Sequence, residues 1–423
     1  MKKIILGLGT VMALMSLAAC SSGNQETGKD DSGKKEIVIT SWDTAADALK
    51  ECATEYMKEH KDIKITVQPS DAQLQKVTPN LISGKGAPDI IHTQARDFSG
   101  VLAKFPDQFL DITDKVADIK TDFTDAAWNS TYADDGSIHA MPWDIGPTAI
   151  YYRTDYFEEA GIDPASIKTW DDFIAAGKKF KQALPDVMFT SDGSPTDYDH
   201  YQIFLNQLGG SFIKDGKIDM ESPASIQAFE MIQKMFKSGI METDEGDINS
   251  FTNGKLGCII NPVWFAGHIE SKVADEAGKW KVMAMPAFEE GGNTHANLGG
   301  GTLAITTQSK NPDEALDFLK YCLTTTKGQD VMMSKGLFPS YTPYYETAEF
   351  NKENEYFGMP LNVFFGELTA DVPEIEYGTI MPDTYTPLGN ACADIKNGKD
   401  VKKTAADCAD KISEATKVEI NKY

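Results

Sequence analysis

The sequence predicts an α/β protein with a parallel sheet in its first folded segment and room for a second domain. Between residues 36 and 93, strand-like and helix-like segments alternate as β-α-β-α-β, the pattern of a parallel sheet with right-handed crossovers. Similar alternation resumes after residue 147, and an apolar strand returns at residues 299–306. The chain has 423 residues, which is enough for two domains with separate cores.

The chain begins with a secretory leader. Lys2 and Lys3 supply positive charge, residues 4–17 are apolar, and Leu17-Ala18-Ala19 precedes Cys20. Roughly 14 apolar residues are too few to cross a bilayer, so residues 1–19 are predicted to be a signal peptide. The cysteine resembles the bacterial lipoprotein signal, in which Cys20 would be acylated (palmitate) and hold the protein on the extracytoplasmic face of the cell membrane. The alternative is a simple signal with a chance cysteine.

Residues 20–35 contain no apolar residue after the cysteine, which predicts a flexible leash. The folded part then starts with a buried strand at residues 36–41. An amphipathic helix follows, with Ala45, Leu49, Cys52, Tyr56 and Met57 on one side. The remaining elements of this segment are a strand at 63–67, a helix at 72–83 and a strand at 88–93.

Candidate binding residues follow the first and third strands. Ligands of parallel α/β sheets bind beyond the carboxyl ends of strands, where the strand order reverses. If the order is 2-1-3, the crevice contains Trp42, Asp43, Gln94 and Arg96. An indole beside hydrogen-bonding side chains suits a polar, hydroxylated ligand with one apolar face. The alternative for Trp42 is a half-buried packing residue.

The later elements begin with a strand at 148–153. Thr169 is predicted to cap the next helix with Asp172 at its third position, and Trp170 should pack structurally. Further strands are expected at 187–190, 256–261, 280–285 and 299–306, and further helices at 198–208, 222–238, 312–323 and, within 382–423, on either side of residues 397–399.

Composition excludes several classes of function. The net charge is −24, and no Lys/Arg stripe with interleaved aromatics exists, which argues against nucleic-acid binding. The six histidines show no ligand spacing, so neither metal nor cofactor is expected. Five cysteines follow Cys20; most should be inert core thiols, and a disulfide between Cys392 and Cys408 is left open.

Several short motifs together resemble one known family. They are Ala87-Pro88-Asp89-Ile90, Met141-Pro142-Trp143-Asp144, the run from Tyr151 to Ile162, Gly299-Gly300-Gly301-Thr302 and Gly336-Leu337-Phe338-Pro339. In this order they resemble the extracellular solute-binding proteins that deliver oligosaccharides to bacterial ABC importers, the maltose-binding-protein-like group. Each motif alone is loose, and none identifies the sugar.

The resemblance implies two α/β lobes, each a mainly parallel sheet flanked by helices, joined by a hinge that the chain crosses more than once. Lobe 1 would comprise residues 36–145 and 299–339, and lobe 2 residues 147–297 and 340–423. A neutral sugar or oligosaccharide would bind between the lobes, which would close over it and present it unaltered to the permease subunits. We expect a monomer.

The resemblance also adds candidate ligand contacts. Trp143 and Asp144 would stand beside the hinge, Trp264 would stack on the sugar, Gly300 would allow close backbone approach, and Tyr341 would lie at the cleft edge. The alternatives are a buried helix-start residue for Trp264 and a flexible crossover for the glycines. Tail residues from Asp371 to Tyr385 could add contacts that the sequence does not rank.

Two other functions remain open. The same fold could bind a polyamine or glycerol phosphate, although a phosphate would require several convergent cations and Arg96 is a single one. A lipid-anchored glycoside hydrolase would need two carboxylates in a cleft. With 64 acidic residues such pairs arise by chance, so we predict a binding protein rather than an enzyme.

Overall fold

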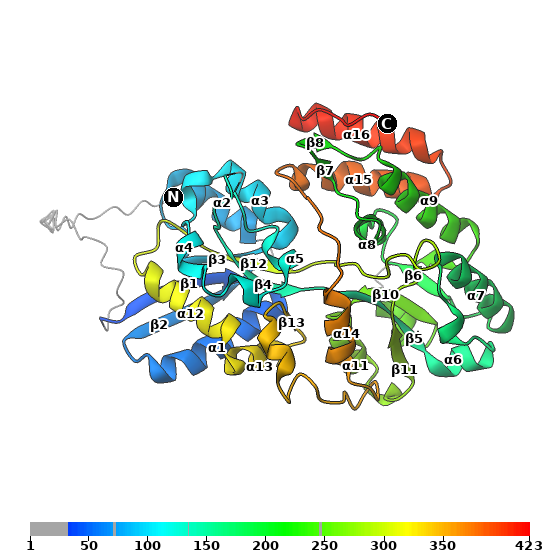
Figure 1. The fold of residues 1–423 in the computed structure, drawn as a ribbon, viewed down its shortest axis with the longest axis horizontal. Helices are drawn as coiled ribbons and strands as arrows, with labels where there is room; N and C mark the ends of the chain where they lie inside the picture. Colours follow the sequence, from blue (N-terminus) through cyan, green and yellow to red (C-terminus); the bar gives the residue numbers. More distant parts are fainter. Residues whose placement is uncertain (1–32, 71–72, 134, 245–247) are drawn as a thin grey trace, which may run out of the picture.

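The computed structural model describes residues 33–70, 73–133, 135–244 and 248–423 (Figure 1). The predicted signal peptide, Cys20 and most of the predicted leash lie outside this part of the chain. Within it, no helix combines the length and apolar character that crossing a bilayer requires.

One lobe is built on a six-stranded sheet. Its strands are β1 (Lys35–Ser41), β2 (Ile63–Pro69), β3 (Ile90–Gln94), β4 (Met141–Ile145), β12 (Gly301–Ile305) and β13 (Phe338–Pro339). They lie in the spatial order β13-β4-β12-β3-β1-β2. Strand β1 pairs parallel with both β2 and β3, so the 2-1-3 order expected from the sequence is present.

Helices flank this sheet. They are α1 (Asp43–Glu59), α2 (Gln73–Ser83), α3 (Ala95–Lys104), α4 (Thr113–Val116), α5 (Asp125–Trp128), α12 (Pro312–Thr324) and α13 (Thr326–Ser334), with 3₁₀ turns at Pro106–Gln108 and Lys120–Asp122. Leu49 and Tyr56 of α1 pack with Ile39, Leu303 and Phe318 in one buried cluster. Burying each such side chain stabilises the fold by about 1.5–3 kcal/mol.

The other lobe is built on smaller sheets. Its strands are β5 (Thr148–Arg153), β6 (Thr190–Asp192), β7 (Ile213–Lys214), β8 (Lys217–Ile218), β9 (Met241–Thr243), β10 (Cys258–Pro262) and β11 (Trp280–Met283). Three of them form a sheet in the order β10-β5-β11. The others form two separate pairs, β6 with β9 and β7 with β8. The helices are α6 (Thr154–Glu159), α7 (Trp170–Ala183), α8 (Asp199–Gln207), α9 (Pro223–Lys237), α10 (Ile248–Thr252), α11 (Phe265–Lys272), α14 (Leu361–Thr369), α15 (Met381–Lys396) and α16 (Val401–Thr416), with 3₁₀ turns at Pro164–Ser166, Ala274–Glu276 and Thr342–Glu346.

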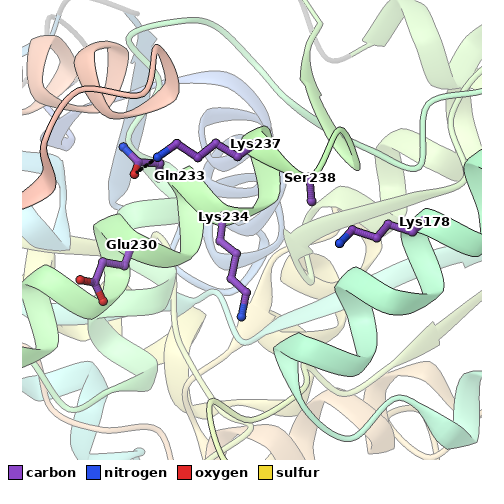
Figure 2. Close-up of a pocket in the computed structure, with 6 residues that line it drawn as sticks. All are labelled: Lys178, Glu230, Gln233, Lys234, Lys237 and Ser238. Carbon is purple, nitrogen blue, oxygen red and sulfur yellow. Dashed lines mark hydrogen bonds between the residues drawn. The ribbon is translucent and has the colours of Figure 1, made fainter.

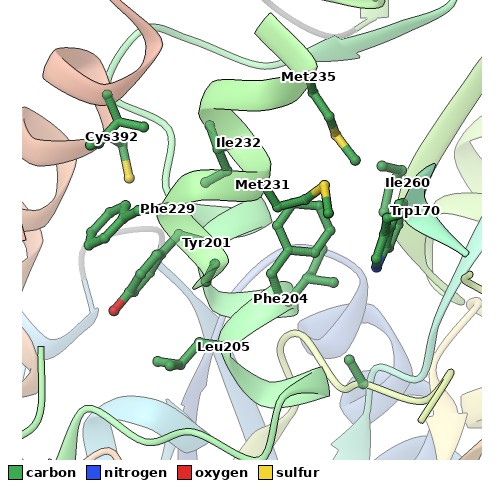
Figure 3. Packing of buried hydrophobic residues seen from close by; sticks show 14 of the residues in the cluster. Trp170, Tyr201, Phe204, Leu205, Phe229, Met231, Ile232, Met235, Ile260 and Cys392 are labelled. Carbon is green, nitrogen blue, oxygen red and sulfur yellow. The ribbon is translucent and has the colours of Figure 1, made fainter. Parts of the chain in front are cut away.

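The core of this lobe joins the middle of the chain to its end. Tyr201, Phe204 and Phe229 from α8 and α9 pack with Trp170 and with Cys392 of α15 (Figure 3). The predicted capping box is confirmed, because Thr169 and Asp172 exchange hydrogen bonds at the start of α7. Trp170 is fully buried, as predicted, and its indole N–H donates to Gln207 at 3.0 Å.

The two-lobed α/β architecture is confirmed, but the expectation of mainly parallel pairing is wrong in detail. In the six-stranded sheet β12 runs antiparallel to β3 and β4, and β13 runs antiparallel to β4. In the three-stranded sheet both β10 and β11 run antiparallel to β5. The direction of a strand depends on where the preceding connection re-enters the sheet, and the apolar pattern of the strand itself does not record this.

Two segments cross between the lobes side by side. The backbone N–H of Leu298 donates to the Gly146 carbonyl at 2.9 Å, and the Gly146 N–H donates to Asn297 Oδ1 at 2.8 Å. A Cβ on Gly146 would lie 2.0 Å from the Leu298 carbonyl oxygen, so only glycine permits this approach. A third connection runs from β13 through α14 to α15.

The five cysteines in the described part of the chain are buried and free, including Cys392 and Cys408. The disulfide that the sequence left open between those two residues is therefore not formed. Burial raises the pKa of the Cys392 thiol well above its usual range, which makes it an inert core group.

Candidate functional site

Trp42 and His92 form a stacked pair on two neighbouring strands. Trp42 follows β1, His92 lies in β3, and the two rings are parallel, with centroids 3.9 Å apart at 8°. The parallel register that places Thr40 opposite Ile91 puts Ser41 beside His92, and the Ser41 hydroxyl lies 2.8 Å from His92 Nδ1. His92 is buried and Trp42 is half-buried, so one face of the indole is covered by imidazole.

Trp143 lies behind this pair. Its ring contacts the His92 ring edge-on, with centroids 6.1 Å apart, and the residue has no exposed surface. The indole N–H has no hydrogen-bond partner among the described residues. The structure thus places Trp143 under the stacked pair, and its role as a ligand contact stays a prediction.

Asp144 and two glycines complete this group. Burial raises the pKa of the Asp144 carboxyl from its ordinary 3.8 to about 7, although a hydrogen bond from the Gly301 backbone favours the ionised form. A Cβ on Gly300, at φ 98°, would lie 2.8 Å from the Asp144 carbonyl oxygen. A Cβ on Gly301 would lie 2.3 Å from His92 Nε2 and 3.2 Å from Asp144 Oδ1. Because residues 300 and 301 are glycines, their backbone can lie directly against Asp144 and His92.

Trp264 approaches the same glycine run from the second lobe. It precedes α11, it is half-buried, and its indole nitrogen lies 3.6 Å from where a Cβ on Gly299 would stand. Asp144 and Trp264 thus adjoin the Gly299–Gly301 backbone directly, and Trp42 adjoins it through His92. Trp42, Asp144, Gly300 and Trp264 we call the glycine-run group.

Arg96 reaches from α3 of the first lobe into the second lobe. Its Nη1 donates to Gln202 of α8 at 3.3 Å and lies 3.9 Å from Asp199. Its guanidinium carbon lies 5.7 Å from the Tyr198 ring centroid and 5.4 Å from that of Tyr385, within cation–π range. Arg96 is therefore engaged in contacts between lobes.

The residues next to Arg96 extend these contacts. The Tyr385 hydroxyl of α15 donates to Asp97, and the Ser99 hydroxyl donates to the Gly378 carbonyl at 3.2 Å. Gln202 also donates to the Tyr377 hydroxyl at 3.0 Å. Together, Arg96, Asp97, Ser99, Tyr198, Gln202, Tyr377 and Tyr385 form what we call the interlobe contact.

The sequence indicated only part of the interlobe contact. Arg96 was a predicted ligand contact, whereas Tyr377 and Tyr385 fall in the tail segment that the sequence left unranked. The sequence did not mark Gln202 as a contact residue, because glutamine is common in amphipathic helices. The aromatic residues of the tail, after a gap in the helix pattern, were the feature that could have pointed to Tyr377 and Tyr385.

The remaining predicted ligand contacts are Gln94, Asp43 and Tyr341. Gln94 ends β3 and pairs in register with Gly301, so its backbone adjoins the glycine-run group. Asp43 is exposed at φ 47°, in the first turn of α1. Tyr341 contacts Phe123 edge-on, with centroids 5.3 Å apart, and packs against the buried clusters.

An open hollow lies on the second lobe between α7 and α9 (Figure 2). It is lined by Lys178, Glu230, Gln233, Lys234, Lys237 and Ser238. Lys234 is paired with Asp171, and Lys237 donates to Gln233 at 2.6 Å. None of the predicted ligand contacts lines this hollow. Across the part of the chain that the structure covers, no group of His, Cys, Asp and Glu could hold a metal ion.

Comparison with known proteins gives a consistent result. Residues 42–329 match the family described as bacterial extracellular solute-binding protein. The chain is 28% identical to the arabinooligosaccharide-binding protein of Halalkalibacterium halodurans, over 85% of this chain and 83% of that protein. It is 29% identical to the lactose-binding protein of Rhizobium radiobacter, over 84% and 86%. A crystal structure of an extracellular solute-binding protein of family 1 superposes with a TM-score of 0.76 at 25% identity, over 90% of this chain and 99% of that one.

Proposed function

Since the chain belongs to the bacterial extracellular solute-binding protein family, we propose that it is the extracytoplasmic binding component of an ABC importer and captures a neutral sugar or oligosaccharide. The glycine-run group is the observation that carries the choice of ligand. It combines two half-buried indoles from different lobes with a carboxyl group and closely approaching backbone. The names of two relatives, which bind arabinooligosaccharide and lactose, support the same class.

Ligand binding and lobe closure are coupled in this proposal. Sugar hydroxyls need donors and acceptors from both walls, because each one left unpaired in a dry site costs about 1–3 kcal/mol. Contacts that exist only when both walls touch the sugar favour the closed arrangement. The interlobe contact supplies further bonds between the lobes, and lobes that separated at this surface would lose them.

The charged side chains near the site also argue against the two alternative ligands, a polyamine and glycerol phosphate. A polyamine would favour ionised carboxylates, whereas burial favours the protonated form of Asp144. Glycerol phosphate would need free cations, whereas Arg96 is engaged by Gln202 and the neighbouring tyrosines. We therefore place neutral saccharides first, and we propose that the protein returns them without catalysis.

The export signals complete the proposal. Residues 1–19 would be cleaved as a signal peptide, Cys20 would carry lipid, and residues 20–35 would act as a leash at the cell membrane. We propose that one lobe comprises residues 36–145 and 299–339, and the other residues 147–297 and 340–423. Two observations support this division: β4, β12 and β13 belong to the same sheet as β1 to β3, and α15 and α16 pack on α9. The ABC permease subunits would receive the sugar from a monomer of this protein.

Calorimetry tests the ligand class. The purified protein would be titrated with arabinotriose, lactose, maltotriose, spermidine and glycerol 3-phosphate. We expect at least one saccharide to bind and to be recovered intact by chromatography. Tight binding of spermidine or glycerol 3-phosphate alone, or cleavage of the saccharide, would contradict the proposal.

Truncation of the indoles tests the site. We expect Trp42→Ala or Trp264→Ala to weaken binding of that saccharide more than tenfold, about 1.4 kcal/mol, because the apolar sugar face loses its stacking partner. Trp42→Phe and Trp264→Phe serve as controls that retain an aromatic ring at each position. If neither truncation changes the affinity, the glycine-run group is not the site.

Membrane attachment has its own test. We expect Cys20→Ser to move the protein from the membrane fraction to the soluble fraction of the producing bacterium, with unchanged saccharide affinity. Retention of the variant in the membrane fraction would contradict lipidation at Cys20.

A further inference from the structure

We propose that His92 is the positioning residue for the Trp42 indole: it fixes the plane on which the ligand stacks without touching the ligand. The inference deepens the proposed function and depends on it for the role of Trp42. In structural terms, the His92 ring sets the orientation of the half-buried Trp42 ring that stacks on it.

The contacts of His92 leave its ring one orientation. Its Nδ1 is 2.8 Å from the Ser41 hydroxyl, the Trp143 ring meets it at 67° with centroids 6.1 Å apart, and the Gly301 backbone lies beside Nε2. A side chain at residue 301 would occupy the space of Nε2, since a Cβ there would come within 2.3 Å. His92 is therefore held on three sides by the sheet that carries it.

Among the described residues, Trp42 has no ring contact besides the one with His92. It is the N-cap of α1, where its carbonyl accepts a hydrogen bond from the Ala46 N–H at 3.0 Å, but its side chain forms no capping bond. Asp43, the next residue, adopts φ 47°, which directs the chain sharply into the helix. The parallel stack at 3.9 Å and 8° is thus the contact that defines the indole plane.

Because His92 covers one face of the Trp42 indole, only the opposite face is open to a ligand. A sugar ring can stack only on the side opposite the imidazole, which faces away from β3. The histidine ring is neutral in this position, because burial lowers its pKa to about 3. The stack therefore carries no charge at the pH of the cell exterior, and it is compatible with an uncharged ligand.

Fixing the Trp42 ring before the ligand binds should raise the affinity by a measurable factor. A side chain immobilised only upon binding lowers affinity, and the usual cost for one side chain corresponds to a factor of roughly 3 to 10. We expect His92→Ala to weaken saccharide binding by about that factor. His92→Phe should bind nearly as the native protein does, because a phenyl ring restores the flat face without any nitrogen.

The decisive measurement needs no ligand. Acrylamide quenching of Trp42 fluorescence would be obtained as the difference between each protein and the same protein carrying Trp42→Phe. We expect the Trp42 quenching constant to rise at least twofold in His92→Ala and to return to the native value in His92→Phe. His92→Leu, which fills the volume without a flat face, should resemble His92→Ala and replaces it if that variant fails to fold.

His268 offers a matched control. It also neighbours a candidate indole, but its ring meets Trp264 edge-on at 6.0 Å and 85°. We expect His268→Ala to leave the quenching of Trp42 unchanged. Thermal unfolding of every variant would show that the folded state persists under the conditions used.

The outcomes separate this inference from the proposed function. Unchanged Trp42 quenching in both His92→Ala and His92→Leu overturns the inference. Equal losses of affinity in His92→Phe and His92→Ala also overturn it, because the imidazole nitrogen would then act directly. If quenching changes as expected but none of arabinotriose, lactose and maltotriose binds the native protein, the positioning of Trp42 by His92 is supported and the proposed function fails.

Discussion

Asp144 illustrates how a single residue in the site departs from its ordinary chemistry. It belongs to β4 at the point where the first sheet ends and the chain leaves for the second lobe. The Gly300–Gly301 backbone closes over it, and this burial disfavours the ionised carboxylate. The carboxyl therefore remains able to donate a hydrogen bond at neutral pH, which a sugar oxygen can accept.

The raised pKa of Asp144 predicts a pH-dependent stability. The folded pKa of about 7 exceeds the ordinary 3.8, so folding is favoured by protonation. This contribution is complete below about pH 4 and is lost as the pH rises through 7. We expect Asp144→Asn to gain at least about 1 kcal/mol relative to the native protein between pH 5 and pH 8.

Urea denaturation of both proteins at pH 5, 6.5 and 8 measures this difference. Asp43→Asn is the control, because Asp43 is exposed. Parallel stability curves for Asp144→Asn and the native protein would contradict the prediction.

At this scale the sequence predicted local features well and distant ones poorly. The capping of α7 by Thr169 and Asp172 was predictable because both partners lie within four residues. Trp42 is a candidate because it follows a strand, and Asp144 is one because the family resemblance places it beside the hinge. The hydrogen bond from Tyr385 to Asp97 joins residues 288 positions apart, and no local pattern encodes such a pairing.

The paired crossing segments are the element that joins the lobes. The Leu298 backbone N–H donates to the Gly146 carbonyl, and Pro147 bridges Asn297 in an antiparallel arrangement. The strand content around this crossing was predictable from apolar runs bounded by turn residues. Pairing direction was not, because β5, β10 and β11 carry similar apolar patterns whichever way they run.

Gly146→Ala tests the closeness of the crossing. Its Cβ would meet the Leu298 carbonyl at 2.0 Å, so the segments must separate and weaken their bonds. We expect the free energy of unfolding to fall by about 2–3 kcal/mol. Chemical denaturation measures the change.

Gly267→Ala is the matched control for that substitution. Gly267 lies in α11 with no atom within 4 Å of its would-be Cβ, so alanine should stabilise by about 0.5–1 kcal/mol. Equal effects of the two substitutions would show that the crossing tolerates expansion.

At the scale of the whole molecule, two lobes touch through surfaces contributed by α3, α8 and α15. The two-lobed class could be predicted from the order of motifs along most of the chain. How the lobes meet could not, because their contact depends on the angle of the crossing segments and on loops of variable conformation. The interlobe contact is thus a property of the assembled molecule alone.

Gly100→Ala tests whether the interlobe contact sets the distance between lobes. The glycine lies within α3, where alanine favours the helix, yet its Cβ would stand 2.8 Å from the Thr379 carbonyl oxygen. We expect a larger radius of gyration in small-angle scattering and unchanged or greater thermal stability of the first lobe. Gly267→Ala should scatter as the native protein does, and identical scattering from Gly100→Ala would contradict the prediction.

The hydrogen-bonded crossing has one more implication, for the mechanics of transport. The two crossing segments cannot slide past each other unless the bonds from Leu298 to Gly146 and from Gly146 to Asn297 break. A closing motion that keeps these bonds would have to rotate both segments together. Such a motion would return the two walls to the same alignment at each delivery.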